Sequence, residues 1–138
     1  MGGTAPDGRH TEARVQVPAF LARQFYEAGS LRNTASGFSL QARNPMGGGM
    51  LVGIGRLVVD GRRIPVGAVS ALRDGETDPI LASEVSPRKP IRVAVGDRIT
   101  LFVTGEPLAP GKHRLEVELF EVNLGALRFA IDDRLAAP

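Results

Sequence analysis

Apolar and polar residues alternate with a period close to two along most of the chain beyond residue 36. In segment 36–43, Phe38, Leu40 and Ala42 share one parity, and polar residues stand between them. Successive side chains of a β-strand point to opposite faces, so this pattern predicts a half-buried strand. The same alternation recurs in residues 91–95, 99–104, 115–119 and 127–131.

Residues 50–59 are different because apolar side chains occupy both parities. This pattern predicts a central strand, or a strand that a second layer covers. Gly53 and Gly55 interrupt the run and indicate a bulge or a close approach of another segment to the backbone. Asp60-Gly61 follows directly and is a strong hairpin signal, which predicts a return strand over 62–66 that continues through 67–72 after a kink.

Turn-forming residues separate these runs at regular intervals, and the sequence holds 17 glycines and 10 prolines. About seven to nine short strands joined in this way predict an all-β fold, an antiparallel β-sandwich of jelly-roll-like or immunoglobulin-like form. A small closed barrel is the main rival. We expect one domain over residues 18–138 after a flexible tail over 1–17, with segment 18–28 open between a short helix and a first strand.

Composition narrows the functional classes. The chain has no cysteine, which excludes disulfides and thiolate metal sites. Its net charge is +2, its arginines are scattered, and it has no tryptophan, so a basic stripe with stacking aromatics for nucleic acid is absent. No apolar run approaches the roughly 20 residues that span a bilayer. A cytoplasmic protein that binds neither nucleic acid nor membrane is the expectation.

The sequence gives little support for a catalytic site or a metal site. His113 has the opposite parity to Glu116 and Glu118 in its strand, so the three should face apart and not share a metal ion. The serines lack a nucleophile motif, and the adjacent acids Asp132 and Asp133 should point to opposite faces. The sequence therefore predicts no catalytic residue and no metal ligand, and His113 is expected to be an ordinary surface histidine.

The most unusual stretch is a glycine-rich loop before the central strand. A phosphate-binding loop would continue with lysine and a helix, whereas a strand pattern follows these glycines. A mobile loop of this kind would fit against a partner or a ligand, and a plain hairpin connection is the alternative. We predict a partner interface or substrate-mouth loop formed by Arg43, Pro45, Met46, Gly47, Gly48, Gly49 and Met50.

The order of several short motifs resembles a known family. It runs from Gly29-Ser30-Leu31-Arg32-Asn33 through Gly37-Phe38, Arg43-x-Pro45, Val59-Asp60-Gly61, Gly96-Asp97 and Leu108-x-Pro110-Gly111-x-His113 to Asp132-Asp133-Arg134. Over roughly residues 20–135, this order is similar to the small β subunit of bacterial C-glycoside deglycosidases. The family often has an aromatic and a basic residue after the proline of Arg-x-Pro, where this chain has Met46 and Gly47.

The resemblance implies a non-catalytic β-sandwich subunit that docks on a larger TIM-barrel subunit. That partner would hold a divalent metal, manganese in most members, and would cleave the carbon–carbon bond of 3-oxo-C-glycosides of the flavonoid type by elimination. This chain would hold no cofactor and would shape the mouth of the barrel. Two other readings stay open, a free-standing binding module for carbohydrate or a small ligand and a structural homo-oligomer.

Overall fold

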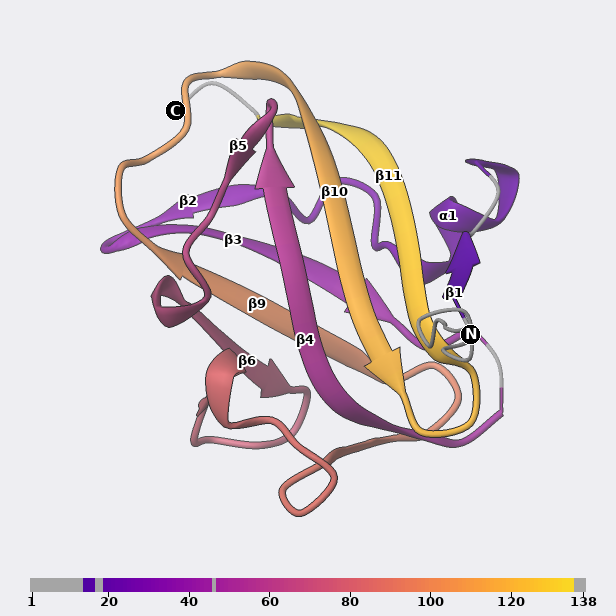
Figure 1. The fold of residues 1–138 in the computed structure, drawn as a ribbon. Coiled ribbons are helices and arrows are strands. Elements are labelled where there is room, and N and C mark those ends of the chain that lie inside the picture. Colours follow the sequence, from indigo (N-terminus) through magenta and orange to yellow (C-terminus); the bar gives the residue numbers. More distant parts are fainter. Residues whose placement is uncertain (1–13, 17–18, 46, 136–138) are drawn as a thin grey trace, which may run out of the picture.

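The computed structural model describes residues 14–16, 19–45 and 47–135. Their strands form two sheets that face one another across an apolar interior, with the three longest strands in one layer (Figure 1). The predicted antiparallel β-sandwich is therefore confirmed. Both sheets are open rather than closed on themselves, which decides against the small barrel.

The first sheet has the order β1-β11-β10-β4-β5, and β8 pairs with the opening residues of β4. All its pairs are antiparallel except β1 with β11, which is parallel. The strands of this sheet are β1 (Arg14–Gln16), β4 (Gly49–Val59), β5 (Arg62–Arg63), β8 (Ile91–Val93), β10 (Gly111–Glu121) and β11 (Gly125–Leu135).

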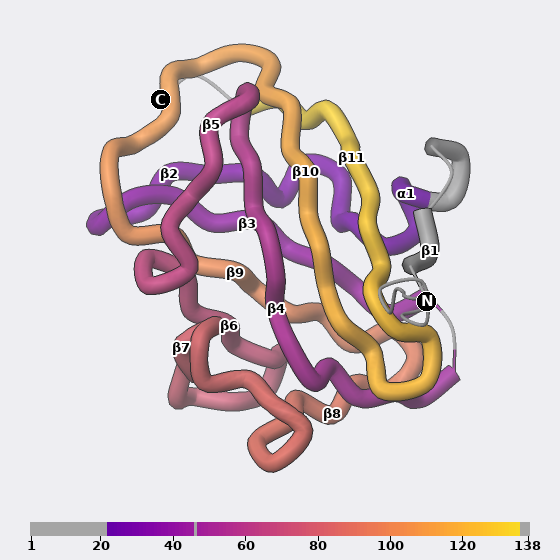
Figure 2. The backbone as a smooth tube through the Cα atoms, in the orientation of Figure 1, coloured from indigo at the N-terminus to yellow at the C-terminus, as the bar shows by residue number. Residues whose placement is uncertain are grey.

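The second sheet has the order β2-β3-β9-β6-β7 and is antiparallel throughout. Figure 2 shows how the chain crosses repeatedly from one layer to the other. The strands of this sheet are β2 (Arg32–Thr34), β3 (Gly37–Arg43), β6 (Val69–Arg73), β7 (Ile80–Leu81) and β9 (Arg98–Thr104). The helical elements are α1 (Ala19–Phe25) and the 3-10 turns η2 (Val66–Ala68) and η3 (Ala82–Glu84).

The predicted alternation of apolar and polar residues determines which side chains form the core. Burial in β10 switches at every residue from His113 to Val117, so one side faces the second sheet and the other faces solvent. Leu40, Leu101 and Leu115 are at most 1% exposed and meet in the interior. Apolar burial of this kind is the main favourable term in folding, and in this chain it rests on aliphatic side chains.

Gly53 and Gly55 in β4 show both features that the sequence indicated, a bulge and a close approach of another segment. The register of β4 against β10 shifts twice, between Val117 and Leu119 and between Phe120 and Glu121. At the same places the side chains of β10 lie across the backbone of β4. A Cβ atom on Gly53 would be 2.9 Å from the Phe120 ring, and one on Gly55 would be 2.5 Å from the Glu118 carboxylate.

The Asp60-Gly61 turn is confirmed, because both residues have positive φ, 52° and 80°, as a type I′ hairpin requires. The return strand is shorter than predicted. β5 ends at Arg63, and the chain then leaves the first sheet through Pro65 and η2 to enter the second sheet as β6. Proline has no N–H for the ladder, so pairing cannot continue through this position.

The ambiguous segment near the N-terminus forms the helix α1 and then a single bridge between Tyr26 and Ala42. Tyr26 is 1% exposed, and its hydroxyl donates to Asp133 at 2.5 Å. Burial and this carboxylate raise the pKa of Tyr26 far above its ordinary value. β1 lies within the segment predicted as a flexible tail, and the rest of 1–17 lies outside the described residues.

The helices of the described residues are all short, and α1 has only 7 residues. None has the length and apolar character that crossing a membrane would require.

Candidate functional site: an apolar cavity at one end of the sandwich

One end of the sandwich, called the cavity end below, consists of residues 44, 45, 47 and 48, turn 94–97 and turn 122–124. Backbone hydrogen bonds join these segments, from Asn44 N to Asp97 O, from Gly96 N to Asn44 O and from Val122 N to Met50 O. In Figure 2 the first bends of β4 and the turn between β10 and β11 lie together at the lower end of the molecule. The chain thus forms a continuous rim around this end.

A cavity of about 280 Å³ opens inside this rim. Both sheets contribute to its wall, so it lies between the layers and is not a surface groove on one of them. The lining residues are Phe25, Ala42, Arg43, Asn44, Gly47, Gly48, Gly49, Leu51, Val93, Ile99, Leu119, Glu121, Asn123, Leu124 and Leu127.

The inner wall of the cavity is apolar and fixed. Leu51, Ile99 and Leu119 belong to the hydrophobic core and are buried, as is Leu127. Phe25, at the end of α1, stacks on the buried ring of Phe129 with centroids 6.1 Å apart. These side chains are held by strands of both sheets and by a helix that packs on β11, so the wall is preformed.

Asn44 organises the loop side of the rim. Its side-chain amide donates to the carbonyl oxygens of Gly47, Val93 and Ala94 at 3.1 to 3.3 Å. This one side chain therefore joins the glycine loop to the end of β8 and to turn 94–97. Such local bonds replace the strand pairing that the loop cannot make.

Glu121 organises the opposite side of the rim. Its carboxylate accepts the N–H groups of Met50, Asn123 and Leu124 at 2.8 to 3.1 Å. Partial burial would raise the pKa of Glu121, but these backbone donors outweigh it and hold the pKa below its ordinary value. The carboxylate is therefore ionised, and its oxygens accept hydrogen bonds from backbone N–H groups and not from a group inside the cavity.

The predicted loop residues divide into two groups. Arg43, Gly47, Gly48 and Gly49 line the cavity, whereas Pro45 and Met50 do not. Met46 lies outside the described residues. Both functions predicted for this loop, a partner interface and a substrate mouth, stay predictions that the geometry does not test.

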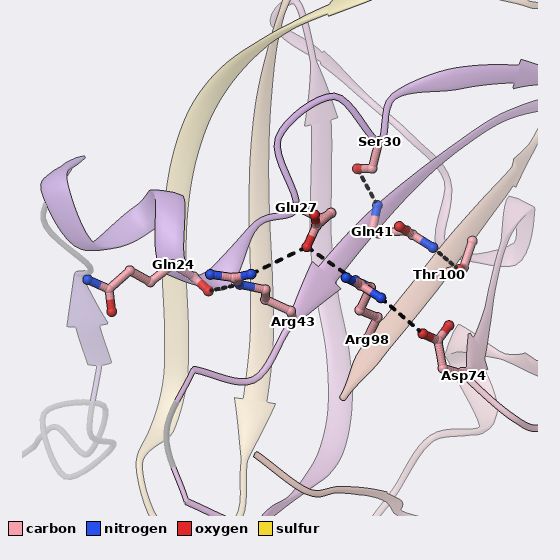
Figure 3. Close-up of polar contacts among 8 residues, drawn as sticks. All are labelled: Gln24, Glu27, Ser30, Gln41, Arg43, Asp74, Arg98 and Thr100. Carbon is pink, nitrogen blue, oxygen red and sulfur yellow. Dashed lines mark hydrogen bonds and ion pairs between the residues drawn. The ribbon is translucent and has the colours of Figure 1, made fainter. Parts of the chain in front are cut away.

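Arg43 belongs to a polar network on the outer face of the second sheet (Figure 3). Its Nε donates to the Gln24 carbonyl at 3.1 Å, and its guanidinium lies 3.5 Å from Glu27. Arg98 pairs with the same Glu27 at 3.2 Å and with Asp74 at 3.7 Å. The charged end of Arg43 is thus engaged away from the cavity, and its stem supplies the lining.

Sequence reasoning missed the residues that complete the site, chiefly Phe25, Asn44, Glu121 and Leu124. Asn44 gave a usable signal, because an Asn-Pro pair at a strand end indicates a turn. Glu121 also precedes a turn, Val122-Asn123-Leu124-Gly125, whose N–H groups need acceptors. Nothing in the sequence brings these two segments together, since they lie 77 residues apart and meet only through the sheet.

His113 is buried, at 8% exposure, so the expectation of a surface histidine is wrong. Its ring lies 2.6 Å from the Asp60 carboxylate through Nδ1 and 2.6 Å from the Ala109 carbonyl through Nε2. A carboxylate and a carbonyl oxygen both accept, so this environment favours an imidazolium that donates from both ring nitrogens at a pH below its pKa. The Ala109 carbonyl and the Asp60 carboxylate raise the pKa of His113 above 6.5 against the effect of burial.

The adjacent acids point to opposite faces, as predicted. Asp132 pairs with Lys112 and Arg114 on the exposed side, whereas Asp133 accepts the N–H groups of Gly29 and Leu31 and the Tyr26 hydroxyl. Among the residues that the structure describes, no three His, Asp or Glu side chains gather as metal ligands. Asp60, Asp132, Asp133 and His113 thus join strands, turns and loops to one another.

The family comparison gives a clear assignment. The sequence model described as hydroxymethylglutaryl-CoA reductase, N-terminal domain, matches residues 21–136. The match spans most of α1 and every strand except β1.

The chain belongs to this family.

A search of curated proteins finds no match.

This assignment overturns the resemblance to the small subunit of C-glycoside deglycosidases, and with it the carbon–carbon lyase activity on 3-oxo-C-glycosides. The alternatives of a free-standing carbohydrate module and a structural homo-oligomer gain no support from it either. The reason lies in the motifs themselves. Asn33 binds both backbone groups of Leu108, Asp60 binds His113, and Asp133 binds Gly29 and Leu31. These residues specify turns and loop attachments of a sandwich, and fold does not determine activity.

Proposed function

We propose that this β-sandwich is a non-catalytic accessory domain of a hydroxymethylglutaryl-CoA reductase. The observation that supports the proposal is the family match over residues 21–136, which coincides with the sandwich and adds no second structural unit. The reductase itself would reside in another polypeptide or domain. This domain would associate with it and affect its assembly or access to its active site.

The chemistry of the described polar groups agrees with an accessory role. His113 has both nitrogens bound to acceptors, Glu121 holds three backbone N–H groups, and Asp133 holds the segment after α1. General acid–base catalysis needs a group that can exchange a proton with a substrate within hydrogen-bond reach. Side chains that already bond to the backbone or to one another in this way are poor candidates for general acid–base catalysis.

The larger barrel subunit with its divalent metal was implied by the overturned resemblance alone, and the structure does not test it. The loop from Arg43 to Met50 remains the predicted contact. Gly48 suits a test because a Cβ there would have Val93 O, at 3.9 Å, as its nearest neighbour, so Gly48→Asp adds a charge without a clash. Gly67 is a matched control, since a Cβ there meets nothing within 4 Å and its φ is not positive.

The experiment is co-expression of this chain with the catalytic polypeptide of a hydroxymethylglutaryl-CoA reductase from the same source. Size-exclusion chromatography measures association, and mass spectrometry measures loss of hydroxymethylglutaryl-CoA in the presence of a nicotinamide reductant. We expect co-elution, turnover only when the catalytic polypeptide is present, and a changed rate when this chain is added. Turnover by this chain alone, or no association and no effect on the rate, would overturn the proposal.

The same mixture tests the predicted contact. If the loop is the interface, Gly48→Asp lowers co-elution and Gly67→Asp does not. Equal co-elution of both variants would place the interface elsewhere and leave the loop as the mouth of the cavity.

A further inference from the structure

The cavity between the sheets is the feature of this molecule that the accessory role does not use. Its inner wall is carbon, contributed by Leu51, Ile99, Leu119 and Leu127 from four different strands. It is open to solvent at the rim of the cavity end, so a ligand can enter without unfolding the domain. The chemical character of its ligand follows from the polar groups at its rim and from its volume.

Two polar side chains at the rim, Glu121 and Asn44, already bond to the chain itself, whereas Asn123 also lines the cavity. The Glu121 carboxylate accepts three backbone N–H groups, and the Asn44 amide donates to three carbonyl oxygens. Arg43 turns its guanidinium to Glu27 and the Gln24 carbonyl. A polar ligand, or a cluster of ordered water, would find few partners inside, whereas an apolar group loses nothing on entry.

The volume sets the size of the occupant. An apolar cavity of about 150 Å³ takes up one benzene molecule, and this cavity, at about 280 Å³, is close to twice that size. It therefore holds roughly ten to twelve carbon atoms. A helix, with a diameter of about 10 Å including side chains, is too large to enter.

We infer that the cavity end binds a small hydrocarbon group, an aliphatic chain of about ten carbons whose polar end stays at the rim. Leu124, which is 37% exposed at the mouth, would close over the chain and lose solvent contact. Recognition is by shape and apolar contact rather than by charge. This inference does not rest on the proposed association with a reductase, although Gly47, Gly48 and Gly49 belong both to the cavity lining and to the loop predicted as the partner contact.

The test titrates the isolated full chain with primary alcohols from hexanol to dodecanol and follows backbone amide and methyl shifts by NMR. Each added methylene should tighten binding by about fourfold, because its burial contributes about 0.8 kcal/mol, up to about ten carbons. Binding should then level off as the cavity fills. Shifts should concentrate at Leu51, Leu119, Leu124 and Leu127. Decane-1,10-diol, which carries a hydroxyl into the apolar wall, should bind at least tenfold more weakly than decanol.

Two glycine variants block the mouth without straining the backbone. Gly48→Leu places its Cβ 3.9 Å from Val93 O, and Gly47→Leu meets nothing within 4 Å, so both should fold. Each should weaken decanol binding at least tenfold, and the matched Gly67→Leu should leave it unchanged.

Three results would overturn the inference: no saturable shifts at the cavity residues of the wild-type chain, affinity that does not depend on chain length, or equal affinity of Gly48→Leu and Gly67→Leu. The first two need no variant and stand even if a substitution impairs folding. Because no reductase is present, failure here leaves the proposed function intact, and failure of the reductase assay leaves this site intact.

Discussion

The loops at the two ends of the sandwich cover its apolar interior to different extents. The hairpin end is formed by the Asp60-Gly61 turn and loop 105–110. The side chain of Leu108 in this loop packs into the core, and His113 joins the loop to Asp60 by bonding both Asp60 and the Ala109 carbonyl. At the cavity end, Glu121 and Asn44 fasten the loops to one another, and the apolar loop side chains Val95, Val122 and Leu124 stay exposed. One end is filled by its own loop and the other is left open.

The difference shows that polar bonds at a loop do not by themselves close a core. Both ends use a carboxylate that accepts backbone N–H groups, Asp60 from Arg114 and Glu121 from Met50. Only the hairpin end adds an apolar side chain that reaches inward. The two ends should therefore respond differently to equivalent substitutions, with stability affected at one and ligand access at the other.

The largest difference should come from the apolar loop residues themselves. Leu108→Ala removes a side chain that is 9% exposed and should lower the free energy of unfolding by about 2–3 kcal/mol. Leu124→Ala removes one that is 37% exposed and should change it by no more than about 0.5 kcal/mol. Denaturant unfolding of the two variants measures both. Equal losses would mean that the two ends are packed alike.

The Asp60–His113 pair should give a smaller, pH-dependent effect. The pKa of His113 is raised above 6.5, so its contribution is complete below that pH and is lost as the pH rises through the raised pKa. The pKa of Asp60 is lowered by His113 and by the Arg114 N–H, so its contribution is present above 3.8 and is lost as the pH falls through the lowered pKa.

The pair should therefore stabilise the fold most between about pH 4 and pH 6.5. Asp60→Asn keeps a residue that tolerates the positive φ of this turn and should cost about 1–2 kcal/mol in that window. Unfolding measured from pH 4 to pH 9 should show the difference between wild type and variant shrinking toward alkaline pH. A difference that grows with pH would contradict the assignment of an imidazolium.

At the cavity end, Glu121→Gln tests the corresponding bond. The neutral amide has one acceptor oxygen in place of two, so it cannot serve Met50 on one side and Asn123 with Leu124 on the other. We expect a loss of about 1 kcal/mol in stability and a larger relative loss of decanol affinity, because the mouth loses its shape. Asp60→Asn, which lies at the other end, should leave decanol affinity unchanged.

The smallest effect should come from the exposed network in Figure 3, which lies beside the cavity but outside it. Arg98 is 45% exposed and bridges Glu27 and Asp74. Arg98→Gln should change the free energy of unfolding by no more than about 0.5 kcal/mol, with the difference vanishing in high salt. A loss above 1 kcal/mol would show that this network supports the cavity wall through Arg43.

Several parts of this fold followed from local rules. Phe38, Leu40 and Ala42 are buried as their alternation predicts, although Ser39 between them is buried as well. Asp60-Gly61 adopts the positive φ values that the hairpin needs. The glycines of β4 marked a bulge under two side chains of β10. Each of these depends on neighbours in sequence, or on a steric demand that a single residue type meets.

Other parts could not follow from local rules. The predicted return strand over 62–66 ran through Pro65, and nothing local indicated that the chain would change sheets there. His113 has the parity of the core residues Leu115 and Val117, yet its burial depends on Asp60 and Ala109 arriving from elsewhere. The glycine loop was recognised as unusual, but its cavity is formed by side chains from both sheets.

The sequence alone determined that the chain forms strands with apolar sides, where many of them turn, and that these apolar sides must meet in a common interior, because side-chain periodicity and turn conformation are local properties. Only the tertiary structure decided which strands pair, which loop fills the core and which leaves a cavity. Those outcomes depend on contacts between residues far apart in the chain, whose energies no local pattern records.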